Sequence, residues 1–427
     1  MLFDNLLSWS TANGLKTPLQ IRQNEITGYR YVVMDPTELD KLSTIPTPDS
    51  TTTTMTDLID APLSLSMTSK TSDGLADRLL FEQLRGEDSF YAPYLATLPS
   101  LESFQKTLPR FWKDDTARWE YIQADQGQLH AAVELDDERL KLSCDDWAQA
   151  VVDSRSHFVP PNGDEYALTP VLDMINHESS ITTKMLRQND EDGNDSDDDN
   201  DRIRLQIATS ALYTTNNHPS SSDDNDKSNN NNNNPFLAPL QNFFGGRSSL
   251  SSSSSTPTLI TPDTEVCMSY GSMPNVEFLL NYGFVPTDNP HNVETLEIPL
   301  IRLDKPIRVA VHANGQLDNL QPLRQALVNR QELEELALRD DGSDNKATQQ
   351  SSDNHNNDTI ISKRNELEVL ALVGGTLEEA VYDLKAPIDR AVEAQDALVA
   401  TYLRERQSTL QACLTQLQQE YPELFGY

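Results

Sequence analysis

Four separated segments of the sequence hold the side chains best suited to chemistry. They are GYR at 28–30, SRSHF at 154–158, DMINH at 173–177 and VCMSYGSMPNVEFLLNYGFV at 266–285. An arginine can hold a carboxylate through two parallel hydrogen bonds, and a tyrosine ring can attract a cation to its face. A strand tyrosine is more often a core residue with a satisfied hydroxyl, and an isolated Asn-His pair has no specificity. The segments are therefore informative only as an ordered set.

As an ordered set, the segments resemble the SET-domain protein methyltransferases of the Rubisco large-subunit lysine methyltransferase-like subgroup. INH, then SYG, then NYGFV is similar to the C-terminal half of a SET domain. SRSHF and PRFW at 109–112 are typical of the subgroup, and LLFEQLRGEDSFYAPYLATLP at 79–99 occurs in the family order. The resemblance spans nearly the whole chain.

The resemblance implies an α+β fold of short, mostly antiparallel strands with a pseudoknot, a helical insertion and an all-α C-terminal domain. In the pseudoknot the SYG segment passes beneath the loop carrying INH, a rare exception to the rule against threaded chains. The implied SET domain covers residues 1–290, with the helical insertion at about 70–150, and the helical substrate-binding domain covers 300–427.

Three tracts are too rich in Asp, Asn and Ser to bury enough apolar surface for folding. We expect disordered loops at 187–203, at 214–258 and at about 340–358. Such insertions are tolerated because loop-closure entropy grows only slowly with loop length.

The resemblance also implies S-adenosyl-L-methionine as the cofactor. Asn176 and His177 match the family pair that contacts it, and Gly28 and Tyr29 match the N-terminal element that lies against it. Arg155 would meet the cofactor carboxylate or the mouth of the acceptor channel as a bidentate donor, although a surface ion pair is the alternative.

On the acceptor side, Tyr270 matches the catalytic tyrosine, with its hydroxyl near the transferred methyl group. Tyr282 would form part of the channel wall, and Asp173 would lie near the channel and position the substrate. A packing role at a helix end for Tyr282 and a turn-capping role for Asp173 remain open.

Two positions depart from the family pattern. The N-terminal element usually reads Gly-x-Gly, which lets the backbone approach the cofactor closely, but Arg30 replaces the second glycine and puts cofactor affinity in doubt. His157 occupies a place where the subgroup often has an apolar or aromatic pocket residue. We therefore expect His157 to line the substrate pocket and make it more polar.

The implied reaction moves a methyl group from a sulfonium to a side-chain nitrogen by in-line displacement. Such an enzyme mainly aligns the reacting atoms and removes water. A free lysine has a pKa of about 10.4 and is not nucleophilic while protonated. An aromatic channel and the positive sulfur both lower that pKa, so no dedicated general base is expected.

The formal net charge is −34, of which −21 lies outside the polar tracts at 188–201, 216–258 and 340–358. Nucleic-acid binding needs positive charge against the phosphates, so we expect no nucleic-acid partner. A basic protein substrate would be steered toward this surface, although acidity also serves solubility and does not by itself select a substrate.

The cysteines Cys144, Cys267 and Cys413 are few, odd in number and far apart. This excludes a disulfide framework and a CxxC-type zinc site, so we expect no metal and a reducing compartment, cytoplasmic or nuclear. The N-terminus lacks targeting features, and a plastid location remains open if an upstream segment precedes it. No apolar run reaches the length of a membrane span, and we expect a monomer without a membrane partner.

Periodicity and turn residues predict the elements that carry these segments. Expected strands are LQIRQ, YRYVVM, RLQIATSALY, EVCMSY, TLEIPL and IRVAVHA. Expected helices are Leu2–Ala12, Asp77–Leu84, Asp145–Val152, VEFLLNY ending at Gly283, Leu317–Leu338, Lys363–Ala371 and Leu377–Leu417. Pro387 must break the last of these near Lys385.

The sequence leaves three functions in competition. Lysine methylation of a non-histone protein is the first. Histidine methylation on the same fold is the second, because a neutral imidazole needs less desolvation, and His157 is its only hint. A catalytically silent scaffold is the third; Arg30 supports it, and the retention of Tyr270, Asn176, His177 and Tyr282 opposes it.

Overall fold

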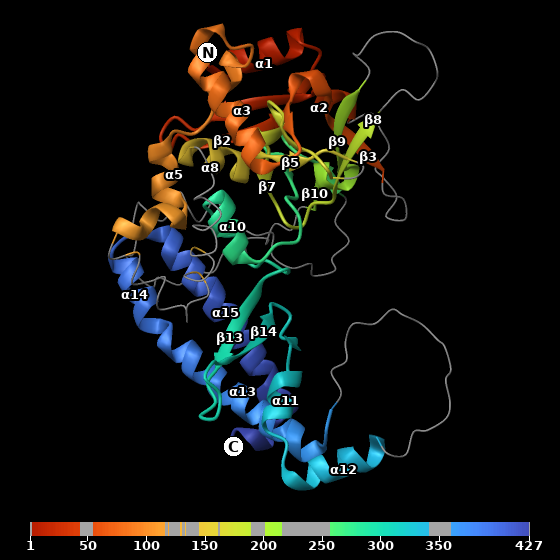
Figure 1. Cartoon of the computed structure of the whole chain (residues 1–427). Helices are drawn as coiled ribbons and strands as arrows, with labels where there is room; N and C mark the ends of the chain where they lie inside the picture. Colours follow the sequence, from red (N-terminus) through yellow and green to blue (C-terminus); the bar gives the residue numbers. More distant parts are fainter. Residues whose placement is uncertain are drawn as a thin grey trace, which may run out of the picture. The chain divides into compact units, whose positions relative to one another are not determined.

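The described part of the chain forms two compact units in the computed structural model (Figure 1). The described residues are 2–42, 54–115, 118, 129, 133, 145–160, 163–188, 201–215, 257–340 and 360–426. The expected loop at 340–358 and most of the tracts at 187–203 and 214–258 lie outside these ranges. Within them, no helix is both long enough and apolar enough to cross a membrane.

Contacts divide the chain at several places. The first unit comprises Met1–Phe111, Glu134–Ser272 and Leu279–Pro286, and the second comprises Trp112–Val133, Met273–Phe278 and Thr287–Tyr427. The main boundary therefore lies at 286–287, and two short segments from earlier in the sequence belong to the second unit.

The first unit is built from short strands. They are β1 (Leu19–Gln23), β2 (Arg30–Met34), β3 (Met55–Pro62), β4 (Met67–Ser69), β5 (His157–Phe158), β6 (Tyr166–Leu168), β7 (Asn176–His177), β8 (Thr183–Gln188), β9 (Arg202–Ala208), β10 (Tyr213–Thr215), β11 (Pro257–Leu259) and β12 (Cys267–Met268). Their sheets have the orders β1-β2, β3-β9-β8, β4-β6-β5, β10-β11 and β12-β7. Every pair is antiparallel except β7 with β12, which agrees with the expected mostly antiparallel array.

Helices cover these strands. They are α1 (Leu2–Ala12), α2 (Pro36–Leu42), α3 (Ser72–Arg85), α4 (Ala92–Leu95), α5 (Leu101–Thr107) and α8 (Asp146–Arg155), with 3₁₀ turns η1 (Leu63–Leu65), η2 (Gly86–Asp88), η3 (Pro109–Asp114), η4 (Leu172–Met174) and η6 (Thr209–Leu212). Thr71 caps α3 by accepting a hydrogen bond from the Gly74 N–H, and Asp145 caps α8 by accepting one from the Ala148 N–H. From the cap at Asp145, α8 continues to Arg155, which lies in its last turn.

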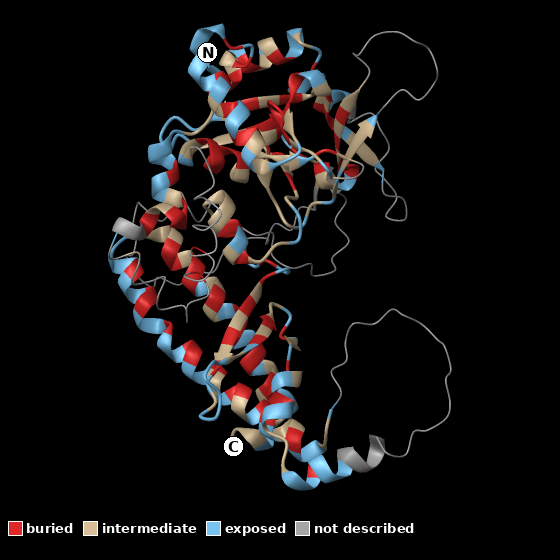
Figure 2. Cartoon of the chain, in the orientation of Figure 1, coloured by how far each residue is buried: buried red, intermediate tan, exposed pale blue. Residues whose placement is uncertain are grey.

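The core of the first unit lies between the strands and the helices (Figure 2). In β9 alternate residues are buried, as expected for a strand with one face on the core. Leu75 and Leu79 of α3, Val151 of α8 and Leu6 of α1 are fully buried in the same cluster. The helices are therefore held by their apolar faces, and their polar faces remain outside.

The second unit is not all-α, and this part of the sequence-based fold is wrong. It contains a three-stranded antiparallel sheet of β13 (Val293–Ile298), β14 (Ile307–His312) and β15 (Leu317–Asp318). Its helices are α11 (Gln321–Ala326), α12 (Arg330–Asp340), α13 (Lys363–Asp383), α14 (Lys385–Glu393) and α15 (Ala397–Glu420), followed by η7 (Pro422–Leu424). The sheet packs on α13 and α15, because Leu296 and Ile298 need an apolar surface to cover them.

The expected helix Leu317–Leu338 is also wrong in its first part, because Leu317 and Asp318 pair with β14. The rest of the range forms two helices, α11 and then α12, where Asn329 and Glu332 exchange side-chain to backbone hydrogen bonds of 2.9 Å each, a reciprocal cap. The expected break near Lys385 is confirmed, since α13 ends at Asp383 and Pro387 lies in the first turn of α14.

Candidate active site

The four segments singled out in the sequence meet around one cavity of the first unit, with a volume of about 310 Å³. Its lining residues are Gly28, Tyr29, Arg30, Pro99, Ser103, Phe104, Thr107, Ser154, Arg155, Asp173, Met174, Asn176, Tyr270, Tyr282 and Phe284. This volume is at the lower end of the range of small-molecule sites. Among the described residues, no group of three or more His, Cys, Asp or Glu side chains is arranged to hold a metal ion.

The parallel pair of β7 and β12 joins two segments that are about ninety residues apart in the sequence. Cys267 is opposite Asn176, and Met268 is opposite His177. Beyond the end of β12, the backbone N–H of Tyr270 donates to Nδ1 of His177 at 3.0 Å, and their ring centroids are 5.2 Å apart. The Asn-His pair and Tyr270 therefore share one site, which was the spatial relationship that the sequence hypothesis required.

Tyr270 points its hydroxyl at the residue that precedes β7. The hydroxyl donates to the carbonyl oxygen of Ile175 at 2.8 Å, and burial raises the pKa of Tyr270 above its ordinary value. The hydroxyl thus stays protonated, with its position set by Ile175 and its lone pairs available to a ligand.

Aromatic side chains form the wall beside Tyr270. The ring centroids of Tyr270 and Tyr282 are 4.9 Å apart, and Phe284 lies 6.1 Å from Tyr282. Gly283 lies between these two with a φ of +72°, and a Cβ there would approach Thr107 to 2.7 Å. Only glycine permits both the left-handed turn that ends α10 (Asn275–Tyr282) and this close approach, so NYGF sets both rings against the cavity.

Arg155 and Asp173 form a buried pair on another wall. Nη1 of Arg155 donates to the Asp173 carbonyl oxygen at 3.0 Å and lies 3.4 Å from its Oδ2, which also accepts from the Tyr94 hydroxyl at 2.8 Å. Burial raises the pKa of Asp173, although Arg155 and Tyr94 oppose it. Within the described part of the chain, Nε of Arg155 and Oδ1 of Asp173 are buried without hydrogen-bond partners.

Asn176 is held by three neighbouring acceptors. Its Nδ2 lies 2.9 Å from the Arg30 carbonyl oxygen, 2.7 Å from Oε1 of Glu265 and 2.8 Å from the Tyr29 hydroxyl. Tyr29 itself donates to Oε1 of Glu265 at 2.8 Å. Because a carbonyl and a carboxylate only accept, the amide must face them with its nitrogen, which leaves the Asn176 oxygen as the acceptor for a ligand.

His157 does not line the cavity, so its expected place in the substrate pocket is wrong. Its Nε2 lies 3.3 Å from Oγ1 of Thr169, while Nδ1 is buried without a hydrogen-bond partner among the described residues. Burial lowers the pKa of His157 to about 4. On β5 successive side chains point to opposite faces; His157 pairs with Ala167 of β6, and its ring lies against Thr169 rather than in the cavity.

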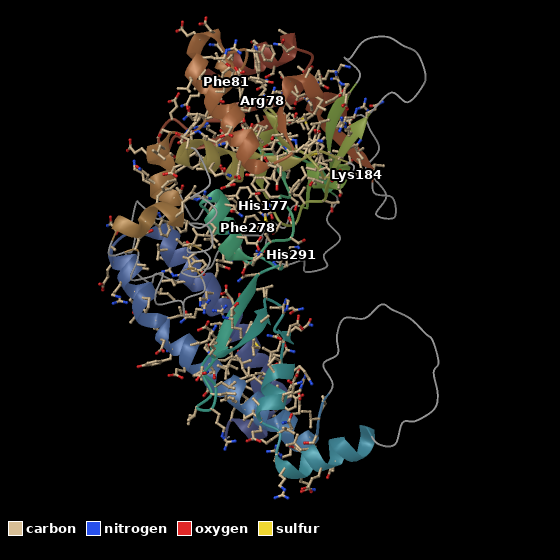
Figure 3. The ribbon with its side chains drawn as sticks, in the orientation of Figure 1. Arg78, Phe81, His177, Lys184, Phe278 and His291 are labelled. Carbon is tan, nitrogen blue, oxygen red and sulfur yellow. The ribbon has the colours of Figure 1, made fainter. Side chains whose placement is uncertain are left out.

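The other expected residues are brought together. Gly28, Tyr29, Arg155, Asp173, Asn176, Tyr270 and Tyr282 line the cavity. His177, labelled in Figure 3, is not a lining residue but accepts a hydrogen bond from the backbone N–H of Tyr270. Three residues that complete the site had not been singled out: Tyr94, Glu265 and Phe284. Each lies inside or beside a quoted motif, but the sequence holds no signal for the hydrogen bonds of Tyr94 and Glu265, which join residues far apart in the chain.

Comparison with solved structures identifies the fold. Rubisco LSMT bound to AdoMet matches with a TM-score of 0.54 and 17% sequence identity, over 99% of this chain and 93% of that chain. The SET domain of LSMT bound to lysine and AdoHcy matches with a TM-score of 0.53 and 17% identity, over 99% of this chain and 92% of that chain. No protein-family model matches the sequence, and no curated protein sequence is significantly similar to it. The chain therefore has the α+β SET fold of Rubisco LSMT, as its ordered motifs predicted.

Proposed function

We propose that this chain is an S-adenosylmethionine-dependent protein-lysine N-methyltransferase that acts on a non-histone protein. The observation that carries the proposal is the convergence of Asn176, Arg155 and Tyr270 on one cavity. The shared fold supports it, since two of the similar Rubisco LSMT structures contain AdoMet or AdoHcy.

The polar side of the cavity fits the cofactor's amino-acid part. That part carries a carboxylate and an ammonium group, and the cavity supplies guanidinium donors together with the acceptor oxygens of Asn176 and Asp173. The guanidinium of Arg155, which lines the cavity, would pair with the carboxylate in a charge-assisted hydrogen bond. When bound there, the cofactor would supply an electrophilic methyl group on a sulfonium.

The aromatic side of the cavity fits an amine acceptor. Tyr270 and Tyr282 present ring faces and little polar surface, so a lysine ammonium entering there loses its hydration and its pKa falls. The protonated Tyr270 hydroxyl offers lone pairs toward the acceptor nitrogen and fixes its direction. In this proposal the residues catalyse by orientation and exclusion of water, without a general base.

Lysine is favoured over the two alternatives. The only sequence hint for a histidine acceptor was His157, and that residue hydrogen bonds to Thr169 outside the cavity. The silent-scaffold alternative rested on Arg30 closing the cofactor site. Its guanidinium instead donates to the Thr97 carbonyl oxygen, and the cavity beside it remains about 310 Å³ in volume.

The test uses the full chain with S-adenosylmethionine labelled in the transferable methyl group and fractionated lysate of the source cells. We expect label on a protein, recovered after hydrolysis as methyl-lysine, and we expect the Tyr270→Phe variant to transfer far less. Label recovered as methylhistidine would show that the acceptor is histidine and not lysine. If no fraction accepted label and calorimetry detected no cofactor binding, the methyltransferase proposal would be rejected and the catalytically silent scaffold would be favoured.

A further inference from the structure

The cavity is positively charged, although the chain as a whole carries a formal charge of −34. Its charged lining residues are Arg30, Arg155 and Asp173. One carboxylate offsets at most one of the two guanidinium charges. An anionic group of a ligand is therefore attracted into this cavity.

Arg30 is held in place by two contacts. It begins β2 directly after Gly28 and Tyr29, and Nη1 donates to the carbonyl oxygen of Thr97. Its guanidinium lies over the ring of Phe3, 5.6 Å from the centroid. No further hydrogen bond joins its guanidinium to the described residues, so its other N–H groups are available to a ligand. Much of the entropy of ordering a long side chain is thus lost before a ligand binds.

Arg155, another lining residue, is held in a similar way. Asp173 engages its Nη1, and Nε is buried with no partner among the residues described. Burial and then the charge of Arg155 lower the pKa of Arg30, because the two guanidiniums repel each other. A carboxylate bound to both would remove this repulsion and satisfy unpaired donors on both.

We propose that Arg30 and Arg155 together bind the α-carboxylate of S-adenosylmethionine. The inference rests on the function proposed for this cavity and assigns a cofactor contact to the position where the family motif has glycine. Arg30 then strengthens cofactor binding, which is the opposite of the effect that its replacement of glycine implied in the sequence. Arginine suits this role better than lysine because its planar fork can donate two hydrogen bonds to one carboxylate.

Calorimetry with two ligands separates this role from a structural one. S-adenosylmethionine contains the carboxylate, whereas 5′-methylthioadenosine keeps the adenosine and sulfur but lacks the amino-acid part. The variants are Arg30→Gln and Arg30→Lys. Arg22→Gln is the matched control, because Arg22 lies on the neighbouring strand β1 and pairs with the exposed Asp263.

We expect Arg30→Gln to weaken S-adenosylmethionine binding by about 10- to 100-fold, the loss of a charged hydrogen-bonding contact. The affinity for 5′-methylthioadenosine should change by less than about 2-fold, Arg30→Lys should lie between, and Arg22→Gln should match the wild type for both ligands. If Arg30→Gln acted only by losing the contact with Thr97, it would lower the melting temperature and reduce the affinity for both ligands equally.

Equal effects on both ligands, or unchanged S-adenosylmethionine affinity in Arg30→Gln, would overturn the role of Arg30 and leave the proposed function standing. Failure of the wild-type chain to bind S-adenosylmethionine would overturn the proposed function, and the role of Arg30 with it. Wild-type binding therefore distinguishes the two failures.

Discussion

Nδ1 of His177 accepts a hydrogen bond from the backbone N–H of Tyr270 at 3.0 Å. An accepting Nδ1 carries no proton, so the neutral ring must carry its proton on Nε2. His177 of the INH segment thereby fixes the position of the Tyr270 backbone in the SYG segment, next to the cavity. The tyrosine hydroxyl is then set by Ile175 of the same β7 region, so both ends of Tyr270 depend on the residues around INH.

Replacing Tyr270 by Phe should reduce turnover by roughly 100-fold, because an oriented hydroxyl is lost with little change in volume. Cofactor affinity should stay within about 3-fold, since the ring and its contact with Tyr282 remain. Single-turnover methyl transfer and calorimetry would measure the two quantities separately. Unchanged turnover would remove Tyr270 from the catalytic role.

Replacing Glu265 by Leu should weaken S-adenosylmethionine binding by roughly 10-fold. Asn176 and Tyr29 both donate to Oε1 of Glu265, and without that acceptor the Asn176 amide is held only by the Arg30 carbonyl oxygen and the Tyr29 hydroxyl, so its orientation is less well fixed. Glu265→Gln keeps an acceptor oxygen and should bind nearly as the wild type does. If both variants lose affinity to the same extent, Glu265 does not act through the amide orientation.

The fold should become less stable as the pH is lowered, because of His157. Burial lowers the pKa of its ring from 6.5 to about 4, so the folded state disfavours the charged form. As the pH falls below 6.5, the unfolded chain binds a proton at His157 before the folded chain does. The contribution of the neutral ring to the free energy of unfolding is therefore fully present above pH 6.5 and lost by about pH 4. Urea unfolding at pH 7, 5.5 and 4 should show a smaller decline for His157→Gln than for the wild type.

The control for that experiment is Gln331→Ala, which changes an exposed residue of α12 in the second unit. Its decline should parallel the wild type, because it removes no titratable group. A decline in His157→Gln as steep as in the wild type would exclude His157 as the cause, and carboxylates would then account for the acid sensitivity.

The ion pair of Arg406 and Glu294 should dominate the stability of the second unit. Nη1 of Arg406 is 2.8 Å from Oε2 of Glu294, and the two side chains are 1% and 2% exposed. Arg406→Met leaves Glu294 buried without its cation and should cost about 3–5 kcal/mol. The double variant with Glu294→Leu should recover much of this loss, as measured by denaturant unfolding.

The matched control is Arg330→Met, which breaks a pair with Glu334 whose side chains are 93% and 65% exposed. Such exposed pairs are worth less than about 1 kcal/mol. A cost for Arg406→Met as small as for Arg330→Met would show that water reaches Glu294 in solution.

Local features of the sequence were sufficient for several elements. The periodicity of Leu2–Ala12 and the Gly283 stop of α10 predicted both helices, because a helix depends on side chains three and four residues apart. The ordered motifs predicted the SET fold, and through it the residues that would share a site. Tyr270 and Asn176 are far apart in the sequence, so no periodicity indicates their proximity, and only the family resemblance predicted it.

The remaining features were decided by the tertiary structure. Whether His157 faced the cavity or Thr169 depended on which face of β5 met the core, and a strand of two residues gives no pattern from which to read that choice. Leu317 and Asp318 joined a sheet because β14 offered unpaired backbone groups, which outweighed local helical spacing. The side chain of Arg30 is positioned by Thr97 and Phe3, both of which are far from it in the sequence. Its proposed role therefore depends on contacts that the sequence does not predict.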